Sequence, residues 1–238
     1  MSSSTTVAPS SASGFDGRAF FEKLWRTSGI QCVGLLVVAY AVYGSQPHVG
    51  ASTDVLLAFY NGERTHILIA AVFSGLAILY LMWFAAALRN TLADAGQDGW
   101  GAASTASSAA VGAMFLLLVG VCTALAYAIA GSGDHMLISA LNDFVWTSLV
   151  LTSFPRAMLI MSAAFGLWRA DLISNVLFAV GVAAVVLVLL GGATWASDGF
   201  WAPDGVYSRV ISPLIGVVWL LVVSGVLLTR SPATRAGW

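Results

Sequence analysis

Six runs of predominantly apolar residues dominate this chain. They cover residues 29–46, 64–88, 104–131, 141–167, 173–194 and 207–229. A helix needs about 20 such residues to cross the hydrocarbon core of a bilayer. No run alternates apolar and polar residues as a half-buried strand would, and a helix in lipid satisfies its own backbone hydrogen bonds. The sequence therefore predicts an all-α fold, a polytopic transmembrane helical bundle of six spans.

The scarcity of charge supports a membrane environment. The 238-residue chain is 59% hydrophobic and only 9% charged, whereas soluble domains carry about 25% charged residues. A net charge of −1 gives no reason to expect a nucleic-acid partner. The expected partner is the lipid bilayer, and a second copy of the chain or other membrane proteins are further candidates.

The basic residues predict how the chain is threaded. Six spans place both termini on one side, and that side would hold Arg18, Lys23, Arg26, Arg89, Arg169, Arg230 and Arg235. The other side would hold only Arg64 and Arg209. Because short cytoplasmic loops are enriched in Lys and Arg, we expect both termini to be cytoplasmic in a multi-pass protein of a plasma (inner) membrane.

The segments that flank the spans are short. Residues 1–14 are rich in Ser and Thr and low in complexity, which predicts a disordered tail. In residues 15–28, apolar side chains recur at helical spacing between charges, which predicts an amphipathic segment at the membrane interface. The six-span domain would then cover residues 29–230, and residues 231–238 would form a short cytoplasmic tail.

Several membrane chemistries lack the residues that they need. Lys23, the single lysine, precedes the first span, so no lysine is placed for a retinal Schiff base. His66 is the only histidine near a span, whereas b-type haem needs two axial histidines. Neither a G-x-x-x-x-G-K-[ST] loop nor an H-E-x-x-H pair occurs. We therefore expect no cofactor, and an enzyme is the least favoured class because no nucleophile–base pair is visible in the spans.

A proline and an arginine interrupt the fourth apolar run, which reads SALNDFVWTSLVLTSFPRAMLI from residue 139. An arginine at the centre of a bilayer costs about 2.5–3.5 kcal/mol on insertion scales. On a helix, Asn142, Trp146, Ser153 and Arg156 share one face. We expect this stripe to face the bundle interior. Polar candidates on the second and third spans are Tyr80, Thr123 and Tyr127.

Two roles for Arg156 remain open at this point. No carboxylate lies at matching depth on another predicted span. The guanidinium can act as an internal hydrogen-bond hub that fixes helix packing. It can instead contact an anion, a lipid headgroup or a substrate, as ionisable residues within membranes often do. In the second case Ser153, Trp146 and Asn142 belong to the binding site.

The predicted outer side also carries a candidate metal site. Glu63 and His66 are three residues apart and can share a helix face, and Asp143 at the mouth of the fourth span could complete a site. Helix capping competes with this interpretation, because acids are favoured at the starts of helices. We favour capping for Glu63, Asp143 and Asp204.

Three features together resemble a family of uncharacterised actinobacterial integral membrane proteins. They are an arginine-bearing basic segment before the first span, LRNTLADA after the second, and LNDFVW…FPRAML in the fourth. The resemblance implies a six-helix membrane fold and a bacterial origin. It implies no activity and no catalytic residue.

Two function classes follow from these observations. The first is transport or permeation of a small solute, anionic in character, past Arg156. The alternative is a non-catalytic accessory or scaffold subunit that packs against other membrane proteins. Flux through the purified protein would separate the two classes.

Overall fold

The computed structural model describes residues 25–229, and this part of the chain contains helices and no strand. The expected all-α fold is confirmed for these residues. The predicted tail at 1–14, most of the interfacial segment at 15–28 and the tail at 231–238 lie outside the described residues.

Each of the six apolar runs forms a helix, and one additional helix, α3, was not expected. In chain order the elements are α2 (Ser28–Tyr43), α3 (Thr53–Gly62), α4 (Arg64–Asp94), α5 (Asp98–Ala124), the π-helical turn η1 (Leu125–Ile129), α6 (His135–Leu151), α7 (Ser153–Arg169), α8 (Asn175–Gly191), the short 3₁₀ turn η2 (Gly199–Trp201), the π-helical turn η3 (Tyr207–Ile211) and α9 (Ser212–Thr229).

Four helical stretches among the described residues are long and apolar enough to cross a membrane. They are Arg64–Asp94, Asp98–Ile129, His135–Arg169 and Tyr207–Thr229. The remaining two apolar helices, α2 and α8, have 16 and 17 residues, which at 1.5 Å per residue gives about 25 Å. The bundle therefore combines long helices with two that are shorter than a typical span.

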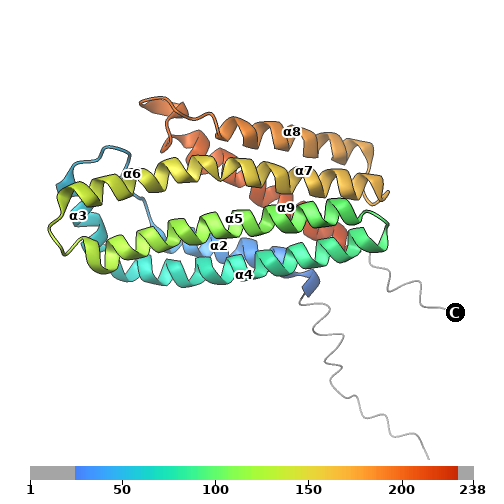
Figure 1. Ribbon diagram of the computed structural model, residues 1–238, viewed down its shortest axis with the longest axis horizontal. Coiled ribbons are helices and arrows are strands. Elements are labelled where there is room, and N and C mark those ends of the chain that lie inside the picture. The colour runs from blue at the N-terminus through green and yellow to red at the C-terminus, as the bar shows by residue number, and fades with distance from the viewer. Residues whose placement is uncertain (1–24, 230–238) are drawn as a thin grey trace, which may run out of the picture.

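Figure 1 shows the helices running side by side along the long axis of the molecule. At one end, α3 and the first part of α6 extend beyond the ends of α2 and α8. This end also carries the α5–α6 connection, whereas the α4–α5 connection lies at the opposite end. Because the helices differ in length, α3 and the first part of α6 form a separate layer at one end of the bundle (Figure 1).

Small residues let neighbouring helices approach closely. Gly112 of α5 lies against Ile78 and Met82 of α4, so a Cβ at this position would be 2.5 Å from the Met82 terminal methyl. The hydroxyls of Ser104 on α5 and Ser162 on α7 form a buried 2.9 Å hydrogen bond. These contacts are typical of membrane bundles, where packing and interhelical hydrogen bonds replace the hydrophobic driving force.

A break separates α6 from α7 where the proline was noted. Pro155 has no N–H to donate to the carbonyl of Leu151. Thr152 stands between the two helices with φ −61° and ψ −16°. Because these values remain close to helical, α7 continues along the direction of α6 (Figure 1).

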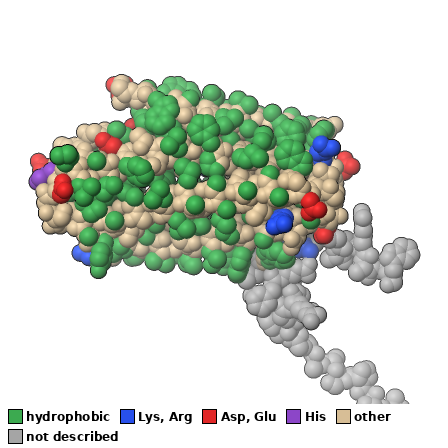
Figure 2. Space-filling view, viewed as in Figure 1, with side chains coloured by type: hydrophobic (Ala, Val, Ile, Leu, Met, Phe, Trp, Pro, Cys, Tyr) green, Lys and Arg blue, Asp and Glu red, His purple; other side chains and the backbone are tan. Residues whose placement is uncertain are grey.

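The surface agrees with a membrane environment. Figure 2 shows hydrophobic side chains along the length of the visible face, whereas most charged side chains gather toward its two ends. Large apolar side chains such as Val72, Leu117 and Val186 are exposed on the long helices and on α8. The apolar exterior and the long helices are compatible with an integral membrane protein.

Candidate functional site

Arg156 lies inside the bundle, on the first turn of α7. The residue is only 8% exposed. Its Nε donates to the carbonyl of Thr152 at 3.3 Å, and its Nη2 donates to the hydroxyl of Ser153 at 3.0 Å. Both partners precede Arg156 on the same helical stretch, because helix side chains lean toward the N-terminus.

The third nitrogen of the guanidinium has no partner. Nη1 of Arg156 is buried and makes no hydrogen bond within residues 25–229. No carboxylate of this part of the chain forms an ion pair with it. An arginine keeps its charge in proteins, so the bundle holds a buried positive charge with one guanidinium nitrogen unpaired.

Residues of two other helices lie beside Ser153, the hydrogen-bond partner of Arg156. The hydroxyl oxygens of Ser212 and Ser153 lie 2.5 and 2.9 Å from the point that a Cβ on Gly191 would occupy. Gly191 is the last residue of α8 and Ser212 the first of α9. The Ser212 hydroxyl is itself buried without a partner. Two unpaired polar atoms therefore lie in the same part of the bundle.

Arg156 lies near the middle of the helical stretch that α6 and α7 form together. The sequence predicted a span at 141–167, and this stretch runs from His135 to Arg169. Ser153 is level with the end of α8, and Arg156 lies about one turn further in. Arg156 is thus about one helical turn from the level at which the shorter helix α8 ends.

The candidate partners on the second and third spans lie elsewhere. Tyr80 packs against Trp83, and the Thr123 hydroxyl donates to the carbonyl of Val119. Tyr127 is 65% exposed, and the Arg64 guanidinium lies 5.0 Å from its ring centre. The stripe itself does face the interior, since Asn142, Trp146, Ser153 and Arg156 are all buried.

The N-terminal half of the stripe binds a loop. Residues 44–52, which connect α2 to α3 and which we call the strap, lie against α6. Asn142, with no exposed surface, accepts hydrogen bonds from the Tyr60 hydroxyl at 3.0 Å and from Gln46 Nε2 at 3.4 Å. It donates to the carbonyl of His48 at 3.2 Å. Trp146 Nε1 donates to the carbonyl of Pro47 at 2.8 Å.

Burial supports this network. Tyr60 is fully buried on α3, and burial raises the pKa of its hydroxyl well above the usual range. The hydroxyl therefore stays protonated as the donor to Asn142. Asn142 and Trp146 thus hold the strap in place, and they are separate from the surroundings of Arg156.

Two acids fasten the same strap. Asp143 Oδ1 accepts from the backbone N–H of Gly50 at 3.0 Å, and Asp204 Oδ2 accepts from that of Val49 at 3.1 Å. The capping interpretation is wrong for Asp143, because α6 begins earlier, where Asp134 accepts from the N–H of Leu137 at 3.0 Å. Glu63 likewise makes no cap bond to α4.

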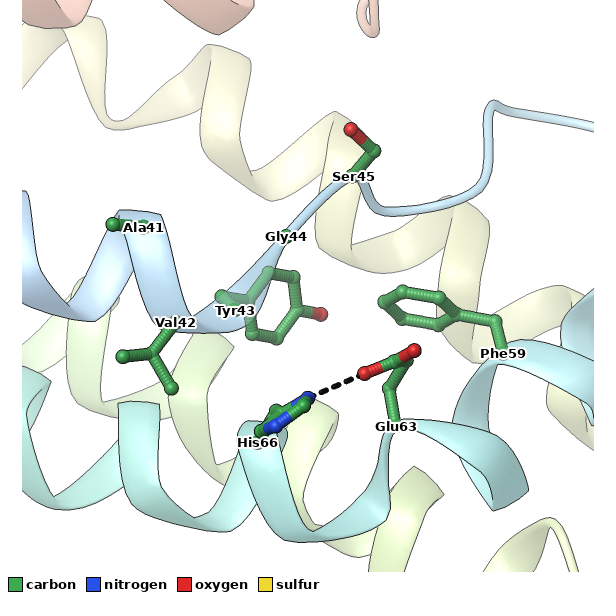
Figure 3. Close-up of a pocket in the computed structure, with 8 residues that line it drawn as sticks. All are labelled: Ala41, Val42, Tyr43, Gly44, Ser45, Phe59, Glu63 and His66. Carbon is green, nitrogen blue, oxygen red and sulfur yellow. Dashed lines mark hydrogen bonds and ion pairs between the residues drawn. The ribbon is translucent and has the colours of Figure 1, made fainter.

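The three candidate metal ligands do not come together. Glu63 Oε2 and His66 Nδ1 are 2.6 Å apart (Figure 3), but Asp143 is bound to the strap. No group of three His, Cys, Asp or Glu side chains that could hold a metal ion occurs in residues 25–229. Cys32 and Cys122 are both buried free thiols. A protein metal site normally takes at least three ligands, and Glu63 and His66 supply two.

Several residues of these sites were missed in the sequence. Gly191, Ser212, Tyr60 and the strap carry no local signal, because each acts through contacts with a distant segment. A weak signal existed for Ser212, which begins an apolar helix next to a proline. Comparisons with family models, with curated proteins and with solved structures found no match for this chain.

Proposed function

We propose that this chain is a multi-pass protein of a bacterial plasma membrane that lets a small anionic solute pass Arg156. In this proposal all six apolar helices cross the bilayer and both termini are cytoplasmic. The excess of basic residues on one predicted side supports this orientation. The resemblance to actinobacterial membrane proteins supports the bacterial origin.

The two shorter helices are compatible with six crossings. A short hydrophobic helix is accommodated by local thinning of the bilayer or by the helices beside it, at a modest energetic cost. On one face α8 packs against α7 and α9, where Gly181 lies against Ala164 of α7 and Trp219 of α9. Other apolar side chains of α8 are exposed. Both short helices therefore have long neighbours that share the same apolar layer.

The observation that carries the transport proposal is the free Nη1 of Arg156. A buried cation without a carboxylate attracts an anion, and the low dielectric of the interior strengthens this attraction. The hydroxyls of Ser153 and Ser212 can donate to the same anion. A guanidinium recognises carboxylate or phosphate through two parallel hydrogen bonds, which an ammonium cannot do.

Flux of anions into proteoliposomes that contain the purified protein tests this proposal. We expect Arg156→Leu to abolish flux and Arg156→Lys to impair it markedly, because lysine keeps the charge but loses the planar fork. Arg89→Lys is the matched control, since Arg89 is exposed at the far end of α4. Wild-type flux in Arg156→Leu, with the protein folded, would reject the pathway.

One observation favours the alternative of an accessory or scaffold subunit. Both hydrogen bonds of Arg156 stay on its own helix, as expected of a residue that braces the helix break beside Pro155. In that case the protein gives no flux, and Arg156→Met is tolerated or even stabilising, because an apolar side chain of similar length removes a buried charge. A stable co-purifying membrane protein would then identify the partner.

A further inference from the structure

A cavity lies apart from Arg156, where the end of α2 meets the start of α4. It has a volume of about 440 Å³ and is lined by residues 41–45, Phe59, Glu63 and His66. Figure 3 shows Tyr43, Phe59 and Glu63 turned toward a common space from α2, α3 and the α3–α4 junction. Glu63 and His66 are 46% and 61% exposed, so the cavity is open to solutes.

The polar side of this cavity holds the carboxylate of Glu63 and the imidazole of His66. Glu63 Oε2 is 2.6 Å from His66 Nδ1. Because a carboxylate can only accept, Nδ1 carries the shared proton. The second oxygen of Glu63, Oε1, has no hydrogen-bond partner in the part of the chain that the structure describes. One carboxylate oxygen therefore remains available to a ligand.

The helix that ends here adds to the negative potential. Residues 41–44 bring the C-terminal turn of α2 to the cavity, and this turn contains no basic residue. A helix C-terminus carries a partial negative charge and favours cations. The nearest arginine, Arg64, is turned to the ring of Tyr127. An anion would thus be repelled from this cavity.

The remaining walls are aromatic and aliphatic. The rings of Tyr43 and Phe59 are 6.0 Å apart and nearly perpendicular, and Ala41 and Val42 complete the apolar lining. Aromatic faces attract cations, and quaternary ammonium groups in particular are recognised by such rings. A bare metal ion would find only two side-chain ligands, whereas an alkylated ammonium matches both the carboxylate and the rings.

We propose that the cavity formed by Tyr43, Phe59, Glu63 and His66 binds an organic ammonium group, with Glu63 Oε1 as the counter-charge and the two rings around the alkyl groups. The ammonium can belong to a lipid headgroup or to a free solute, since the recognition chemistry is the same. This site is independent of the pathway proposed for Arg156.

Tetramethylammonium chloride is a suitable probe for the full-length protein in phosphatidylglycerol nanodiscs. We expect saturable binding by calorimetry that sodium chloride at equal concentration does not reproduce. Glu63→Gln should weaken binding about tenfold or more, and Phe59→Leu about threefold to tenfold, the range expected for one cation–π contact. Asp134→Asn is the control, because Asp134 is an outer acid away from the cavity.

Two further experiments are needed. One distinguishes a lipid headgroup from a free solute as the source of the ammonium, and the other separates this site from the anion pathway proposed for Arg156. If a lipid headgroup occupies the site, phosphatidylcholine nanodiscs will show weaker apparent binding of the probe than phosphatidylglycerol nanodiscs. Equal binding in both lipids assigns the site to a free solute. Arg156→Met should bind the probe normally, whatever its flux. Binding that persists in Glu63→Gln, or that Asp134→Asn loses equally, overturns the proposal.

Discussion

The side-chain amide of Asn142 and the hydroxyl of Tyr60, 82 residues apart in sequence, are joined by a 3.0 Å hydrogen bond at a fully buried position. This bond ties α3 to α6, and the same amide also holds the strap through Gln46 and His48. One side chain thus joins α3, α6 and the strap at this end of the bundle. Buried amides of this kind are costly to remove, because every partner loses its bond at once.

We expect Asn142→Leu to lower the stability of the detergent-solubilised protein. Each buried polar group left without a partner costs about 1–3 kcal/mol, and the substitution leaves the Tyr60 hydroxyl and the His48 carbonyl in this state. Tyr60→Phe should cost less, because Gln46 still donates to Asn142. Thermal unfolding measures both effects. Asn61→Ala, on an exposed position of α3, is the control, and an equal loss in that variant would argue against the network.

The strap should loosen when its acids are removed. Asp143→Ala and Asp204→Ala each delete a carboxylate that accepts a backbone N–H of the strap. We expect hydrogen exchange at Gly50 and Val49, respectively, to accelerate about tenfold to hundredfold, since a charged hydrogen bond contributes about 1.5–3 kcal/mol.

Asp134→Ala provides the matched control for the strap experiment. It should accelerate exchange at the start of α6, near Leu137, and leave residues 44–52 unchanged. Equal exchange at the strap in all three variants would show that the two carboxylates do not hold it.

The helices were predictable because their signal is local. Each of the six apolar runs is helical, the fourth as α6 and α7, with ends within six residues of the expected bounds. The polar stripe of the fourth run turns inward as its spacing predicts. Lipid penalises polar side chains on the outside, so the pattern of a single segment is sufficient for this inference. α3 was missed because its ten residues are too few for a span and follow a polar loop.

The sites were less predictable, because they depend on contacts between distant segments. Asp143 was expected to cap a helix, but α6 begins eight residues earlier and leaves its side chain free to bind Gly50. Likewise, the surroundings of Arg156 depend on where α8 ends and α9 begins. No pattern within the fourth run indicates that Gly191 and Ser212 lie beside it.

Labelling of introduced cysteines tests the proposed orientation. We expect an impermeant thiol reagent added to intact cells to modify Ser132→Cys and Asp198→Cys but not Asp98→Cys, because the first two lie in the predicted outer loops. All three positions are exposed in the structure, so access depends on the side of the membrane. The native thiols Cys32 and Cys122 are only 2% and 7% exposed and give little background. Labelling at residue 98 in sealed cells would reject the orientation.

The contact between Gly191 and the serines beside Arg156 gives the sharpest test of the interior. A Cβ at Gly191 would lie 2.5 Å from the Ser212 hydroxyl and 2.9 Å from that of Ser153. We therefore expect Gly191→Ala to destabilise the protein by about 1–3 kcal/mol, the usual cost of overpacking a well-packed interior. Thermal unfolding in detergent should show the loss.

A second substitution should relieve this overpacking. Ser212→Ala removes the oxygen that the new Cβ meets, and because that oxygen has no partner, the single change should be neutral or slightly stabilising. The double variant Gly191→Ala/Ser212→Ala should then recover part of the stability lost in Gly191→Ala. Gly34→Ala is the control, since nothing lies within 4 Å of a Cβ there and alanine favours a helix over glycine. If Gly191→Ala behaves like Gly34→Ala, α8 does not approach Ser153 and Ser212 this closely. The end of α8 would then not line the proposed anion pathway beside these serines.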